Sequence, residues 1–323
     1  MDTLLSIDVS SDKLQFELEL KGSVQRGPTG CVGNNQIGIE NLVKQALKAG
    51  ACIVLEATGS YHIELVLTAQ AAGLEVCVLN PAQVRSFARS IGQRSKTDKL
   101  DARMILSCAK ALRAEERLRA LRPLCPELLL LKTLLKRREL LVKNRAGLVQ
   151  AGIDKEVIEV MSKNIASLES QIHKICREHS DLYQRLQRIP FVGKISASYL
   201  VALFWDPGLF PSSKAVVAYV GLDVVLKESG RYKGKSKLSK RGWASLRMVL
   251  VAGLKAAGSA RQKSVVARMY QEYMTRSNNP LKWAGAACAV ARKLIETAWS
   301  MAVNGYEFDP QRFNNRKPNP AKP

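Results

Sequence analysis

The sequence has few of the residues that would indicate a zinc site, a disulfide framework or a membrane protein. Its seven cysteines stand singly without a close pair, and its three histidines lack the spacing of metal ligands. Both patterns argue against structural zinc and disulfides. No apolar run is long enough to cross a bilayer, and no signal peptide is recognisable, so we expect no membrane association and a cytoplasmic location.

Acidic residues are also scarce relative to basic ones. The 323 residues include 50 Lys and Arg but only 28 Asp and Glu, a formal net charge of +22. Such an excess predicts a polyanionic partner, and we expect nucleic acid. The content of 46% hydrophobic and 24% charged residues is ordinary for a folded chain, and the length allows two or three domains.

Strands and helices alternate in the first hundred residues, which predicts an α/β sheet layered with helices. The first two strands read as a hairpin with one solvent-exposed face, which carries Gln15, Glu17 and Glu19. The predicted strands cover 3–9, 14–20, 52–55 and 76–79, and the predicted helices cover 37–49 and 61–72.

Four acidic residues stand out in this region. Asp8 and Glu56 each end an apolar strand, and Asp98 and Asp101 share one face of a helix that we expect Thr97 to cap. Carboxylates without His or Cys suit Mg²⁺ or Mn²⁺, bound as one ion or as two. Taken singly, Asp8 could equally be a turn cap, and the helical pair could only complement the helix dipole.

Leucine-rich helices follow from Leu121 onward. In the second of them, apolar residues recur at alternating steps of four and three from Met161 to Leu186, which predicts a coiled coil. We interpret His179, which falls in this repeat, as a core residue. The two helices, separated by Ala151-Gly152, could form an antiparallel hairpin or pair between protomers, so we expect a homo-oligomer, either a dimer or a tetramer.

The segment 189–197 is similar to a helix-hairpin-helix element, in which a glycine turn presents backbone N–H groups to a phosphate. A plain helical turn would show the same pattern. Further on, flexible glycines separate closely spaced basic residues, an arrangement that favours contact with a phosphate backbone. The candidate nucleic-acid-binding residues are Lys194, Arg231, Lys233, Lys235, Lys237, Lys240 and Arg241.

Serines also lie in this basic loop. A serine hydroxyl needs a base, a metal or a positive field to act as a nucleophile, and the loop supplies the field. From composition alone, Ser236, Ser239 and Ser245 would be ordinary polar loop residues.

Motifs at both ends of the chain resemble those of the IS110 insertion-sequence transposases and their Piv-type DNA invertase relatives. The C-terminal motif, Lys-Leu-Ser-Lys-Arg-Gly-Trp, is similar to the family's (Ile/Met/Leu)-Ser-Lys-x-Gly. The family commonly has Pro shortly after a Gly-Leu that matches Gly221-Leu222, whereas this chain continues Asp223-Val224-Val225. The N-terminal motifs are Leu-Leu-Ser-Ile-Asp-Val-Ser, Leu-Glu-Ala-Thr-Gly-Ser-Tyr, Asn-Pro-Ala-Gln and Lys-Thr-Asp-Lys-Leu-Asp-Ala-Arg.

The resemblance implies a fold, a site and a reaction. It implies an RNase H/RuvC-like α/β domain (1–120) and a mostly α-helical transposase domain (187–315). Between them the apolar repeat predicts coiled-coil helices (121–186), and the Pro- and Asn-rich end predicts a disordered tail (316–323). By matching position, the catalytic metal ligands would be Asp8, Glu56, Asp98 and Asp101, and the nucleophile would be Ser239.

The implied reaction is recombination of donor and target DNA through a covalent phosphoserine intermediate. The resemblance also implies guidance by an element-encoded noncoding RNA, and we expect composite sites shared between protomers. Three alternatives stay open: a RuvC-type nuclease that uses water as nucleophile, a DNA invertase without an RNA guide, and a non-catalytic architectural protein.

Overall fold

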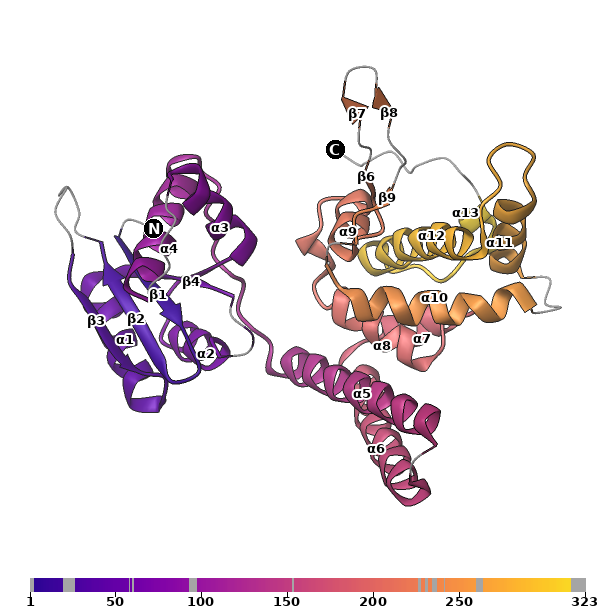
Figure 1. Ribbon diagram of the computed structural model, residues 1–323, viewed down its shortest axis with the longest axis horizontal. Helices are drawn as coiled ribbons and strands as arrows, with labels where there is room; N and C mark the ends of the chain where they lie inside the picture. The colour runs from indigo at the N-terminus through magenta and orange to yellow at the C-terminus, as the bar shows by residue number, and fades with distance from the viewer. Residues whose placement is uncertain are drawn as a thin grey trace. The chain divides into compact units, whose positions relative to one another are not determined.

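The computed structural model describes residues 3–19, 27–57, 59, 61–92, 98–152, 154–225, 228–229, 232–233, 237–240, 242–259 and 264–314. The chain divides into two compact units, Met1–Cys125 and Pro126–Pro323, which are described separately below (Figure 1). The four-part division drawn from the sequence stays a prediction. Its last part, 316–323, lies outside the described residues.

The first unit is built on a five-stranded mixed sheet in the order β3-β2-β1-β4-β5. Strand β2 is antiparallel to β1 and β3, whereas β4 runs parallel to both β1 and β5. This α/β arrangement confirms the predicted fold class of the N-terminal part. The strands are β1 (Thr3–Val9), β2 (Lys13–Leu18), β3 (Thr29–Gly33), β4 (Ala51–Glu56) and β5 (Val76–Leu79).

Helices cover both faces of this sheet. Ile39 and Leu42 of α1 and Leu65 of α2 join the odd-numbered residues of β1 and β4 in one core cluster. On the other face, Ile105 and Cys108 of α4 pack with the even-numbered residues. The helices of this unit are α1 (Gln36–Ala49), α2 (Ile63–Ala71), α3 (Pro81–Ser90) and α4 (Asp98–Ala114).

The hairpin region differs from the sequence prediction in two ways. Strand β3 was not predicted, because its five residues include two glycines; a Cβ at Gly30 would lie 2.6 Å from the Phe16 ring, which explains why glycine is needed there. The second face of the hairpin is not solvent-exposed either. Glu17 and Glu19 are 7% and 9% exposed, because α4 packs over them.

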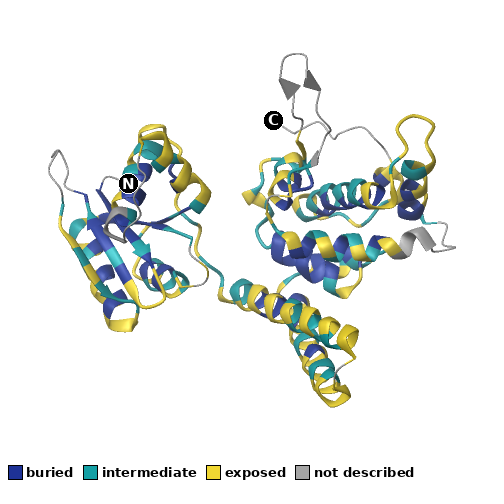
Figure 2. Cartoon of the chain, viewed as in Figure 1, coloured by how far each residue is buried: buried dark blue, intermediate teal, exposed yellow. Residues whose placement is uncertain are grey.

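The second unit is mostly helical, as predicted, and its buried residues gather around α12 (Trp283–Asn304) (Figure 2). Helices α9, α10 and α11 all contact α12. None of the helices in the described part of the chain is both long and apolar enough to span a bilayer. The remaining helices are α5 (Pro126–Ala151), α6 (Lys155–His179), α7 (Leu182–Gln187), α8 (Lys194–Leu203), η1 (Pro207–Leu209), α9 (Ser213–Val220), α10 (Ala244–Ser259), α11 (Val265–Thr275) and α13 (Pro310–Asn314).

Helices α5 and α6 pack against each other within one chain, which is the hairpin alternative of the prediction. Ile165 and Ile172 of the predicted repeat are buried. His179 is not a core residue: it is exposed at the last position of α6, with its ring 6.0 Å from that of Trp205. The apolar repeat continues past the end of the helix, which is why periodicity alone misplaced it. A coiled coil between protomers stays a prediction.

Candidate active site

Two of the predicted acidic residues end neighbouring parallel strands. Ile7 of β1 pairs with Leu55 of β4, so Asp8 and Glu56 follow at matching positions of the two strands. Because side chains alternate along a strand, both belong to the set that includes Leu4 and Val54, on the face covered by α4. Both are partly buried.

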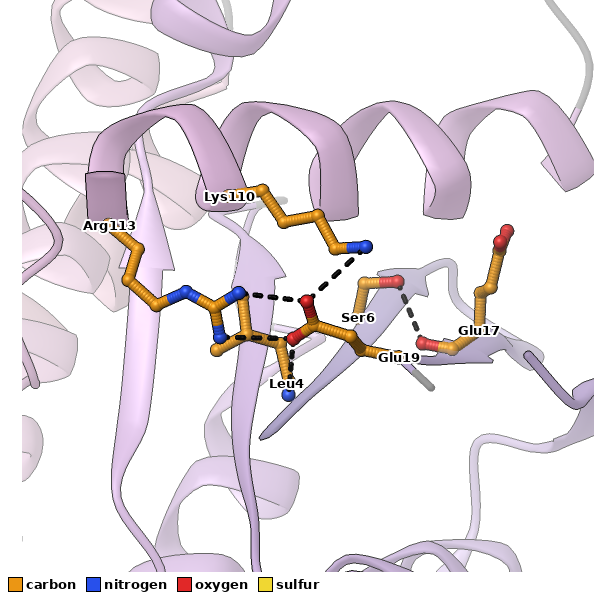
Figure 3. A network of polar contacts seen from close by, with 6 residues as sticks. All are labelled: Leu4, Ser6, Glu17, Glu19, Lys110 and Arg113. Atoms are coloured by element: carbon orange, nitrogen blue, oxygen red, sulfur yellow. Dashed lines mark hydrogen bonds and ion pairs between the residues drawn. The ribbon is translucent and has the colours of Figure 1, made fainter. Parts of the chain in front are cut away.

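The orientation of α4 on this face is fixed at its C-terminal end by Glu19. Arg113 donates from both terminal nitrogens to the two Glu19 oxygens, at 3.0 and 2.8 Å, and Lys110 adds an ion pair at 3.3 Å (Figure 3). The same carboxylate accepts from the Leu4 amide at 3.1 Å, and the Glu19 amide donates to the Leu4 carbonyl at 2.8 Å. The end of α4 is thereby attached to the start of β1.

The Glu19 carboxylate is stabilised in its charged form despite its burial. Burial alone would raise its pKa, but the hydrogen bonds and charges of Arg113 and Lys110 outweigh it and hold the pKa below its usual value. This cluster is a structural ion pair far from the strand ends that carry the predicted site.

Because α4 runs back from Arg113 over the sheet, its N-terminal turns lie toward the ends of β1 and β4. Asp101 shares a helix face with Ile105 and Cys108, which are buried against the sheet. Burial raises the pKa of the Cys108 thiol, and the neighbouring Glu56 carboxylate raises it further. We therefore expect Asp101 to lie near Asp8 and Glu56, on the face of the sheet that α4 covers.

The chemistry of this edge suits a hard cation, because its predicted ligands are all carboxylates. Asp98 is the first residue of α4, but its side chain lies outside the described residues, as does Thr97. In the part of the chain that the structure describes, no group of three His, Cys, Asp or Glu side chains is arranged to hold a metal ion. The four-residue metal set stays a prediction.

Ser239 lies in the second unit, in a short connection between β9 (Lys237–Leu238) and α10. Strand β9 pairs antiparallel with β6 (Val224–Val225), and the pairing continues as the Ser239 amide donates to the Asp223 carbonyl at 3.0 Å. The next amide, of Lys240, donates to the Gly221 carbonyl at 3.2 Å. Backbone pairing therefore runs from β6 and β9 through Ser239 to Gly221, the residue that ends α9.

Two backbone features and one arginine support this connection. Lys240 has φ of 52° and Gly242 has φ of 95°, and a Cβ at Gly242 would lie 1.8 Å from the Tyr219 carbonyl oxygen, so only glycine fits there. Arg247 of α10 donates to the Val220 carbonyl at 2.5 Å and to the Lys240 carbonyl at 3.1 Å. It therefore joins the serine connection to the C-terminal end of α9.

The side chain of Ser239 also has a carboxylate neighbour, since its hydroxyl donates a hydrogen bond to Oδ1 of Asp223. Sequence reasoning missed this residue, because sixteen positions separate the two and only the β6–β9 pairing brings them together. The sequence drew attention to this position only because the chain departs from the family pattern after Gly221-Leu222. That departure did not indicate a role for Asp223.

The predicted nucleic-acid-binding residues are only partly described. Lys194 is the exposed first residue of α8, after Gly193, at the turn that follows α7, and Lys240 is exposed beside Ser239. Lys233 and Lys237 belong to short strands, with side chains outside the described residues. Arg231, Lys235 and Arg241 lie outside the described residues altogether.

Two protein-family models match this chain, one in its N-terminal part and one in its C-terminal part. Residues 5–153 match a family model described as a transposase of the IS110 type with a DEDD domain, and residues 183–271 match the transposase model of the IS116/IS110/IS902 family. The chain belongs to the IS110 family of transposases. A transposase cleaves and rejoins DNA, so this member is a DNA-cleaving recombinase with DNA as its substrate.

Relatives of this IS110 transposase include an invertase and another transposase. The pilin gene-inverting protein of Moraxella lacunata is 26% identical over 80% of this chain and 81% of that protein. The transposase for insertion sequence element IS1111A of Coxiella burnetii is 24% identical over 65% and 66%. Among solved structures, T. thermophilus RuvC in complex with a Holliday junction substrate is similar at 12% identity, with a TM-score of 0.31 over 38% of this chain and 100% of that one.

Proposed function

We propose that this IS110 transposase cleaves and exchanges DNA strands in a Mg²⁺-dependent reaction through a covalent phosphoserine on Ser239. The observation that carries the proposal is the setting of that serine. Its hydroxyl faces the Asp223 carboxylate, and the exposed Lys240 follows it, within the matched transposase region. A positive field and a proton acceptor are what a serine needs to attack a phosphodiester.

The metal ligands in this proposal are Asp8, Glu56, Asp98 and Asp101. Asp8 and Glu56 follow paired residues of β1 and β4, and the all-oxygen chemistry of the four acids fits Mg²⁺, or Mn²⁺ in its place. A divalent ion bound there would supply charge that stabilises the scissile phosphate in the transition state. The four acids would hold that ion, and α4 supplies two of them, Asp98 and Asp101.

The proposed partners are donor DNA, target DNA and an element-encoded guide RNA. Lys194 and Lys240, both exposed, would contact phosphates, together with the other basic residues of 231–241. Such contacts are independent of sequence, so the guide RNA would supply target choice by base pairing. The net charge of +22 is large enough for a protein that holds several nucleic-acid strands.

The proposal is tested by incubating the purified full-length protein with Mg²⁺ and end-labelled element-junction DNA, with and without the element RNA. A denaturing gel then separates free DNA from a protease-sensitive protein–DNA adduct. We expect an adduct with the wild-type protein that disappears in Ser239→Ala and on chelation of the metal. The matched control is Ser277→Ala, at an exposed serine of the same unit, which should leave the adduct unchanged.

Free cleaved ends without any adduct, still formed by Ser239→Ala, would contradict the phosphoserine mechanism and support a nuclease that uses water. An adduct of equal yield without RNA would contradict guidance. The products then distinguish transposition from site-specific inversion, the activity named for the Moraxella relative.

A further inference from the structure

The Asp223 carboxylate accepts a hydrogen bond from the hydroxyl of the proposed nucleophile. The Ser239 hydroxyl donates to its Oδ1, while the Ser239 amide donates to its backbone carbonyl at 3.0 Å. The two residues are therefore held together by both backbone and side chain. Asp223 lies between Gly221, which ends α9 with φ of 76°, and the first residue of β6, so its backbone is fixed on both sides.

Two cations lie beside this contact. Lys240 follows Ser239 directly, and the Arg247 guanidinium binds the carbonyls of Val220 and Lys240 on either side of the contact. Both cations also act on Cys288 of α12: burial raises the pKa of its thiol, and Lys240 and Arg247 oppose that effect. The Ser239–Asp223 contact therefore lies close to two cations, Lys240 and Arg247.

We propose that Asp223 is the general base that takes the proton of Ser239 during DNA cleavage. This inference rests on the proposed function, since it assigns a role only if Ser239 is the nucleophile. A hydroxyl attacking phosphorus must lose its proton, and a base already bonded to it makes that transfer direct. The same geometry holds the hydroxyl oxygen in one orientation before DNA binds.

The step balances as a transesterification. The Ser239 Oγ lone pair forms the new O–P bond, and the Oγ proton passes to Oδ1 of Asp223. The bond between phosphorus and one bridging ester oxygen breaks, and its electron pair leaves on that oxygen, which takes a proton from water and releases hydroxide to the solvent. Asp223 returns its proton when the phosphoserine is later resolved by the reverse reaction.

Asp223→Asn tests the assignment, because asparagine keeps the size and the acceptor oxygen but is not a base. The measured quantity is the single-turnover rate of adduct formation in the full-length protein with Mg²⁺ and junction DNA. We expect a decrease of about 100-fold or more, the usual contribution of general-base catalysis. DNA affinity, measured by fluorescence anisotropy, should stay within twofold. Asp181→Asn, at an exposed aspartate that makes no capping hydrogen bond, is the matched control.

A second variant separates a base from a structural residue. In Asp223→Ala, added formate can occupy the vacated space and accept the proton, so we expect the adduct rate to rise with formate concentration. An Asp223→Asn rate within threefold of wild type, or a folded Asp223→Ala that does not respond to formate, would overturn the inference. A wild-type protein that forms no Ser239 adduct would instead contradict the proposed function itself.

Discussion

Arg113 binds Glu19 through two hydrogen bonds, at 3.0 and 2.8 Å, and so fastens the last turn of α4 to the first residues of β1. The helix reaches the other end of the sheet from that point. Asp101 lies about 18 Å back along α4 at the usual helical rise. Asp8 lies about 13 Å along β1 from Leu4 at the usual strand rise. The ion pair thus fixes the helix that carries Asp101 against the strand that carries Asp8.

Arg113→Ala should destabilise the first unit by about 2–3 kcal/mol, because it leaves the nearly buried Glu19 carboxylate with Lys110 as its remaining cation. Chemical denaturation monitored by circular dichroism gives the free energy of unfolding. Arg119→Ala, at an exposed arginine after the same helix, is the control and should change it by less than about 0.5 kcal/mol. Equal effects of the two variants would show that the ion pair does not anchor α4.

The same carboxylate predicts a pH dependence. The folded-state pKa of Glu19 lies below its unfolded value, so its contribution to stability is fully present above the unfolded pKa and is lost as pH falls through the folded one. The difference in unfolding free energy between wild type and Glu19→Gln should be constant from pH 7 to about 5 and shrink below about 4. If the difference in unfolding free energy between wild type and Glu19→Gln grew as the pH fell, the folded-state pKa of Glu19 would not lie below its unfolded value.

Local sequence patterns predicted helix ends and strand bounds, which depend on interactions between residues close together in the sequence. Gly50 ends α1 in the left-handed conformation, as expected for glycine after a helix, and Val76–Leu79 forms β5 with the predicted bounds. The position of Asp8 and Glu56 at strand ends was also readable from the apolar runs that precede them.

The sequence did not predict the features that depend on packing between elements distant in the sequence. Glu19 looked like a residue on an exposed strand face, and only the docking of α4 buries it against Arg113. Asp223 comes next to Ser239 only through the β6–β9 pairing, and Arg247 binds two backbone carbonyls that no local sequence pattern indicates. Each of these depends on a contact between elements that are separate in the sequence.

Arg247→Ala should reduce the rate of adduct formation at least tenfold, because it removes the side chain that joins the serine connection, through the Lys240 carbonyl, to the end of α9, through the Val220 carbonyl. Arg247→Lys should recover little, since an ammonium group cannot bind both carbonyls in the planar geometry of guanidinium. Single-turnover adduct formation measures both. Arg268→Ala, at an exposed arginine of α11, controls for the loss of one positive charge. A rate for Arg247→Ala equal to that of the control would contradict a positioning role.

Composite sites predict complementation between two inactive variants. If the acids of one protomer act with Ser239 of another, mixed oligomers of Asp101→Ala and Ser239→Ala should regain part of the activity that each lacks alone. Co-expression of the two differently tagged proteins, followed by tandem purification, isolates the mixed species for the adduct assay. Activity that never rises above that of the separate variants would argue for sites built within a single chain.

The chemical identity of the protein–DNA linkage tests the central claim most directly. The adduct formed with Mg²⁺ and junction DNA is trimmed with nuclease, digested with protease and analysed by mass spectrometry. The account predicts a nucleotide attached through phosphate to Ser239, in the peptide that contains Leu238 and Lys240. A nucleotide on another residue, or cleaved DNA without any attached peptide, would contradict it.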